Sequence, residues 1–143
     1  MISLKKAGLL VLALMGYSAS IYGQTQWIVR SPVLIKYTLK SIASDGKQFV
    51  GVGYLGEIAT STNGVAWANM PSGVTRNLNA VGCNDKLFVA VGDSGTILTS
   101  PDGTSWTKRT SSTISQLNGV AWGNNQFVAV GEYDSVATSV LYA

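Results

Sequence analysis

The sequence predicts an all-β protein, and three observations lead to this fold class. A segment of the type Phe-Val-x-Val-Gly occurs at 49–53, 88–92 and 127–131, which defines a constant 39-residue repeat. Glycine is frequent, with 16 residues, and only 12% of residues are charged, which suits short strands joined by tight turns. Outside an apolar leader, no window shows the 3.6-residue apolar period of an amphipathic helix.

The same interval holds at other positions. Leucine recurs at 39, 78 and 117, Thr-Ser at 60–61, 99–100 and 138–139, and tryptophan at 67 and 106. The middle repeat predicts four strands, at 78–82, 87–92, 96–100 and 105–108. Asp102-Gly103 predicts a tight turn before the last of them, because this pair favours positive φ angles. Four short antiparallel strands in a repeat of this length are typical of a β-propeller blade.

Glycines close the second predicted strand of each repeat. They are Gly53, Gly92 and Gly131, and Gly56 and Gly95 follow a little after the first two. The chain must turn sharply here, so we expect backbone conformations that a side chain would forbid.

Residues 1–20 have the parts of a secretory signal peptide. Lys5 and Lys6 precede an apolar run at 7–15, and small residues at 18–20 offer a cleavage site after Ser20, or as late as Gly23. The run is shorter than the roughly 20 apolar residues that span a bilayer, so we expect no stable membrane span after cleavage. An uncleaved anchor is the alternative. The leader predicts a secreted or periplasmic protein from a bacterium.

Composition argues against several kinds of chemistry. Without Lys5 and Lys6, eight basic residues face seven acidic ones, so charge gives no ground for binding nucleic acid. The chain has one cysteine, Cys83, and no histidine, and thus lacks the commonest general base and metal ligand. We expect Cys83 to be a strand residue rather than a nucleophile. No phosphate-binding loop or Cys/His cluster is present, so we expect no metal and no cofactor.

The segments 61–67 and 100–106, Ser-Thr-Asn-Gly-Val-Ala-Trp and Ser-Pro-Asp-Gly-Thr-Ser-Trp, resemble the Asp-box, also called the BNR repeat. Both are one residue shorter than the family pattern before the glycine, and Asn63 replaces the aspartate in the first. The chain from 27 to 139 is similar to the propellers of photosystem II assembly factors and to sialidase-like repeats. The resemblance implies that the polar side chain ties the turn and that the tryptophan packs between sheets. The residues with this implied structural role are Ser61, Asn63, Gly64, Trp67, Ser100, Asp102, Gly103 and Trp106.

The repeat divides residues 24–143 into a partial β-propeller. Residues 27–30 resemble a fourth strand, 39–77 and 78–116 are whole blades, and 117–143 is an incomplete blade. Because propellers usually need at least about four blades, three alternatives stay open. The chain is a piece of a longer propeller, an open stack, or half of a homodimer that completes a six-bladed ring. In the dimer, residues 27–30 of one chain would complete the last blade of the other.

One end of the blades carries the turns between the second and third strands and the links between blades. The copies differ most there, and loops on a rigid scaffold commonly carry function. We expect a binding surface for a protein or glycan partner at this end. Its candidate residues are Tyr54, Arg76, Asp93, Arg109, Glu132 and Tyr133.

The sequence leaves three alternatives for the function of the chain. A non-enzymatic binding scaffold, with a role in assembly in one version, needs no catalytic residue. A sialidase-like glycoside hydrolase fragment would need an arginine cluster, and the chain has only Arg30, Arg76 and Arg109. A gene remnant without function is the third alternative. We expect the first and therefore no enzymatic activity.

Overall fold

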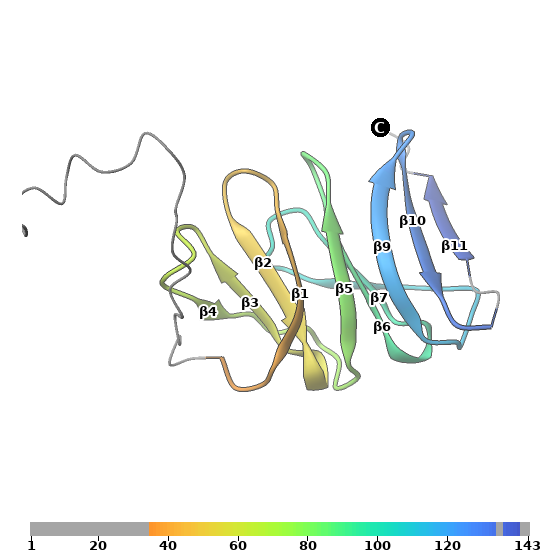
Figure 1. Cartoon of the computed structure of the whole chain (residues 1–143), viewed down its shortest axis with the longest axis horizontal. Coiled ribbons are helices and arrows are strands. Elements are labelled where there is room, and N and C mark those ends of the chain that lie inside the picture. The colour runs from red at the N-terminus through yellow and green to blue at the C-terminus, as the bar shows by residue number, and fades with distance from the viewer. Residues whose placement is uncertain (1–34, 134–135, 141–143) are drawn as a thin grey trace, which may run out of the picture. The chain divides into compact units, whose positions relative to one another are not determined.

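Each repeat folds into one antiparallel sheet whose strands follow one another in chain order (Figure 1). The computed structural model describes residues 35–133 and 136–140, and these contain no α-helix. The strands of the first sheet are β1 (Leu39–Ser44), β2 (Phe49–Gly53), β3 (Ile58–Ser61) and β4 (Ala68–Asn69). Those of the second are β5 (Leu78–Cys83), β6 (Phe88–Gly92), β7 (Ile97–Ser100) and β8 (Thr107–Arg109). The predicted all-β fold class is confirmed.

The third sheet has three strands among the described residues. They are β9 (Leu117–Gly123), β10 (Gln126–Gly131) and β11 (Val136–Val140), with β10 in the middle. The predicted signal peptide at 1–20 and the predicted strand at 27–30 lie outside the described residues.

The fourth strand of the repeat differs from the prediction. It was expected at 105–108, but β8 begins at Thr107 and β4 covers only Ala68–Asn69. The backbone N–H groups of Thr104 and Ser105 donate to the carboxylate of Asp102 instead, so these residues belong to the turn rather than to the sheet.

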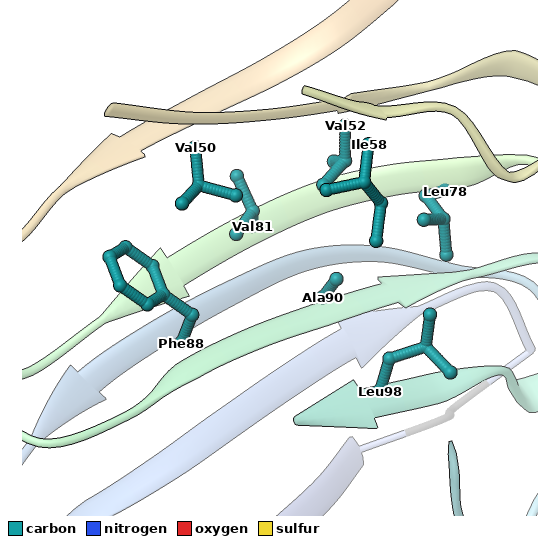
Figure 2. Packing of buried hydrophobic residues seen from close by; sticks show 8 residues of the cluster. All are labelled: Val50, Val52, Ile58, Leu78, Val81, Phe88, Ala90 and Leu98. Carbon is teal, nitrogen blue, oxygen red and sulfur yellow. The ribbon is translucent and has the colours of Figure 1, made fainter. Parts of the chain in front are cut away.

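The sheets pack face to face through their first and second strands. β5 contacts β1 and β2 of the preceding sheet, and β9 contacts β5 and β6 in the same way. Between the first and second sheets lies an apolar core, drawn in Figure 2, of Val50, Val52, Ile58, Leu78, Val81, Phe88, Ala90 and Leu98. Between the second and third lies another, of Ala80, Val89, Val91, Leu117, Phe127 and Ala129.

A β-bulge interrupts the first strand of every sheet at the same repeat position. The pairing register shifts between residues 39 and 41, between 78 and 80, and between 117 and 119. The extra residues are Lys40, Asn79 and Asn118. A bulge re-aims the side chain of the extra residue, so a polar group can occur in a strand that is otherwise largely apolar.

The glycines that end the second strands are required by close contact. A Cβ atom on Gly53, Gly92 or Gly131 would lie within 2.0 Å of a carbonyl oxygen just before the first strand of the same sheet. The φ angles of Gly53 and Gly92 are −166° and −168°, so the expectation of a forbidden backbone conformation is wrong for them. It is confirmed for Gly56 and Gly95, whose φ angles are +76° and +65°.

Replacing Gly92 by alanine should destabilise the fold, because the new methyl group would meet the carbonyl oxygen of Asn77. Overpacking of this kind costs about 1–3 kcal/mol, and a rigid backbone neighbour places Gly92→Ala at the upper end. Gly123→Ala is the matched control, since a Cβ atom there has nothing within 4 Å. Urea unfolding measures both free energies, and equal stability of the two variants would contradict this account of the glycine.

Candidate binding site

We call the end of the sheets that carries the turns between second and third strands, together with the links from β4 to β5 and from β8 to β9, the loop end. One backbone hydrogen bond is repeated in these turns. The first residue of each turn follows the glycine that ends the second strand. It donates its N–H to the carbonyl just before the first strand, which is the same carbonyl that the glycine approaches. The three pairs are Tyr54 to Thr38 (3.1 Å), Asp93 to Asn77 (3.0 Å) and Glu132 to Gln116 (2.9 Å).

The second residue of each turn adopts a left-handed conformation although it is not glycine. Leu55, Ser94 and Tyr133 all have a φ angle of 54°. Tyr133 is 89% exposed and Leu55 is 52% exposed. Side chains at this position are therefore displayed from a fixed backbone, and the repeats place different chemistry there.

Asn79, the bulge residue of the second sheet, joins all three sheets. Its Nδ2 donates to the Oδ1 of Asp93 and to the carbonyl of Leu117, each at 3.0 Å. Its Oδ1 accepts a hydrogen bond from the Nζ of Lys40, the bulge residue of the first sheet. The side chain is buried, so its polar atoms depend on these protein partners.

Asn77 extends this polar cluster to the turn of the first sheet. Its Nδ2 donates to the Oδ2 of Asp93 at 2.9 Å, and its Oδ1 accepts from the backbone N–H of Leu55 at 3.0 Å. Both oxygens of the Asp93 carboxylate are thus hydrogen-bonded to asparagine side chains. Beside it, the Nη1 of Arg76 donates to the Oγ of Ser94 at 2.9 Å.

Tyr54 lies at the edge of the cluster. The Nζ of Lys40 lies 5.1 Å from the centre of its ring, within the range of a cation–π interaction. The side chain is nevertheless 44% exposed. Lys40 therefore links the exposed ring to the buried amide of Asn79.

The structure brings together three of the six predicted loop-end residues: Tyr54, Arg76 and Asp93. Arg109 lies on the outermost strand of the second sheet, where its Nε donates to the Oγ1 of Thr99 at 2.8 Å. Glu132 and Tyr133 occupy the equivalent turn of the third sheet, and both are exposed.

Sequence reasoning missed Lys40, Asn77 and Asn79. A signal for the two bulge residues was present, because positions 40, 79 and 118 are all polar and follow the repeated leucine. Asn77 carries a similar signal, because positions 38, 77 and 116 are all polar and directly precede the repeated leucine.

The opposite end of the first two sheets carries the turns 61–67 and 100–106. The Oδ1 of Asn63 accepts from the N–H groups of Val65 and Ala66, both at 2.9 Å, and the Nε1 of Trp67 donates to the carbonyl of Gly64 at 3.2 Å. The N–H of Gly64 donates to the Oγ of Ser61 at 2.9 Å. The side chains of Ser61, Asn63 and Trp67 thus bind the backbone of the turn itself.

The second of these turns repeats the pattern with aspartate. The Oδ1 of Asp102 accepts from the N–H groups of Ser105 and Thr104, both at 2.8 Å, and these bonds hold the pKa of its carboxyl well below the usual range. The Oγ of Ser100 also donates to this oxygen, at 3.0 Å. Trp106 donates its Nε1 to the carbonyl of Gly103 at 3.1 Å and packs against the core between the first two sheets.

Cys83 is half-buried on β5, and its Sγ lies 3.1 Å from the carbonyl oxygen of Ser44 as a hydrogen-bond donor. Burial raises the pKa of the thiol, which disfavours the reactive thiolate. Within residues 35–133 and 136–140, no three His, Cys, Asp or Glu side chains gather as a metal site would require.

Comparison with known proteins assigns this chain to no family. No family model matches the sequence, and no curated protein matches it.

In the described part of the chain, no helix has the length and apolar character needed to cross a membrane.

Asn79→Ala should lower the free energy of unfolding by about 1–3 kcal/mol, because it leaves partners in all three sheets without their hydrogen bonds. Asn118→Ala is the matched control at the equivalent but exposed position, where we expect a change within about 0.5 kcal/mol. Urea denaturation of the two variants tests this, and a larger loss for Asn118→Ala would contradict the role given to Asn79.

Proposed function

We propose that this chain is an exported, non-enzymatic β-propeller scaffold that binds a protein or glycan partner through its loop end. The proposal combines the leader read from the sequence, the stacked sheets, and the polar and aromatic groups at one end of the stack. A scaffold of this kind needs a rigid framework and a displayed surface, and no reacting group.

We further propose that the turns 61–67 and 100–106 are Asp-box turns and that they serve the framework. This is supported by the hydrogen bonds of Asn63 and Asp102 to backbone N–H groups inside their own turns. The polar side chain, the glycine and the tryptophan are all engaged locally, which leaves recognition to the opposite end of the sheets.

The binding proposal depends on Tyr54, whose backbone is held by hydrogen bonds while its side chain is exposed. Its backbone N–H is tied to Thr38, the next residue is tied to Asn77, and Lys40 approaches its ring, yet the side chain is 44% exposed. A large ring that is already ordered and still accessible can bind at little entropic cost. Tyrosine offers both an apolar face and a hydroxyl, and it is among the residues that dominate binding interfaces.

The surroundings of Tyr54 suit a polar partner with apolar patches. Lys40, Arg76 and Asp93 place charges of both signs beside it, and Leu55 is exposed next to it. A sugar ring or a peptide side chain could stack on the tyrosine while its polar groups meet these side chains.

Tyr54→Ala should reduce partner binding by roughly 30-fold, as expected when a hot-spot aromatic is removed. The measurement combines a glycan array with cross-linking of the protein in the compartment to which it is exported, followed by titration of each recovered ligand. Val65→Ala is the control, because Val65 is 50% exposed but lies in the turn at the opposite end of the first sheet.

Binding that Val65→Ala weakens and Tyr54→Ala leaves intact would place the partner at the wrong end and contradict the proposal. Absence of any ligand in both assays would contradict the binding function itself. Circular dichroism of both variants shows that any loss does not come from unfolding.

A further inference from the structure

Two kinds of sheet face meet wherever sheets pack in this chain. In the joint between the first two sheets, the first supplies what we call its trailing face, with Val50, Val52 and Ile58. The second supplies its leading face, with Leu78, Val81, Phe88, Ala90 and Leu98. The joint between the second and third sheets is built in the same sense, with Val89 and Val91 on the trailing side.

The first sheet has a leading face of its own, on which Gly51 and Ala59 are buried but two larger apolar side chains are exposed. Ile42 and Phe49 hold the positions of Val81 and Phe88 one repeat earlier. They are 57% and 38% exposed, whereas Val81 and Phe88 are 6% and 1% exposed. Isolated exposed apolar residues are common, but here the pair reproduces two positions of a face that is buried elsewhere in the same chain.

The third sheet presents the complementary trailing face. Val128 and Val130 hold the positions of Val89 and Val91, two residues that are almost wholly buried in the middle of the stack. Val130 is 48% exposed and Val128 is half-buried. The two ends of the stack therefore carry the two halves of the joint that the chain forms twice internally.

A polar contact between sheets has equivalents at the same two ends. In the first joint, the Nε2 of Gln48 on the trailing side donates to the carbonyl of Asp102 at 2.9 Å. The residue equivalent to Gln48 is leucine in the second repeat but glutamine again, Gln126, in the third. The equivalent of Asp102 in the first sheet is Asn63. Gln126 and Asn63 thus place the equivalent donor and acceptor on the trailing side of the third sheet and the leading side of the first.

We propose that two copies of this chain assemble head to tail, with the leading face of the first sheet of each copy packed on the trailing face of the third sheet of the other. The occupant is a second copy because both faces continue the established joints of the stack and match one another by repetition. Two copies bring together six of the sheets that the structure describes, within the usual four to eight blades of a closed propeller, whereas three copies would bring together nine. Contacts between two different faces form a closed ring when the rotation from one copy to the next fits. In the proposed dimer, two identical joints close the ring.

Sedimentation equilibrium of the full chain over a roughly 100-fold dilution range should give twice the chain mass, with dissociation on dilution. Ile42→Glu on the leading face and Val130→Glu on the trailing face should each raise the dissociation constant by roughly 30-fold or more, since each variant damages both joints of the ring. Ile114→Glu is the matched control, because Ile114 is 90% exposed on the link from β8 to β9 and belongs to neither face. It should leave the dimer unchanged.

Three results would overturn the proposal: a wild-type monomer at every concentration, an open polymer, or a dimer that Ile42→Glu breaks and Val130→Glu spares. The last would indicate contact between two leading faces, or burial of this face by another segment or partner. Far-UV circular dichroism verifies that each variant is folded, and Ile42→Ser replaces Ile42→Glu if the charge prevents folding. Because the loop end lies apart from both faces, loss of the dimer with Tyr54 binding intact separates this proposal from the proposed function.

Discussion

The whole repeat depends on one close approach, in which a carbonyl oxygen occupies the space where a Cβ atom would lie. In each sheet this oxygen precedes the first strand, and the glycine that it approaches ends the second strand. The N–H of the following residue then binds the same oxygen. Two consecutive strands and the turn after them are thereby held in one geometry, and the sheets can stack because they are alike. Only glycine satisfies this contact, which explains why Gly53, Gly92 and Gly131 recur at one interval although two of them have an ordinary extended φ angle.

The bulge beside this contact links the framework to the proposed recognition surface. The extra residue allows a polar side chain to leave the alternation of the strand, and Asn79 uses this freedom to connect three sheets. The buried amide holds Lys40 and Asp93, and these in turn lie beside the exposed ring of Tyr54 and the turn of Ser94. The residues that make the framework rigid therefore also hold the exposed side chains of the loop end in place. A surface organised in this way loses little entropy on binding, which is the physical basis of the function that we propose.

Periodicity made most of the fold predictable, because a local pattern that recurs at a constant interval reports strands and turns without knowledge of distant contacts. The four-stranded sheets follow from it, and the tight turn at Gly103, with its φ angle of 70°, follows from the Asp-Gly pair. The start of β8 did not, since the side chain of Asp102 competes for N–H groups that a strand would use. At the loop end, exposed turn residues were predictable from variation between copies. The buried partner Asn79 was not, because its role depends on a register shift and on residues a whole repeat away in both directions.

The central claim of this account is that the repeat makes the sheet faces interchangeable, so that the faces at the two ends of the stack meet in a pair of copies. Amide hydrogen exchange of the full chain at low and high concentration tests it most directly. We predict that β2 and β10, which carry the exposed residues of the leading and trailing faces, gain more protection than β6 in the middle sheet as the concentration rises. Protection that is independent of concentration, or that rises more in β6 than in β2 and β10, would contradict the claim.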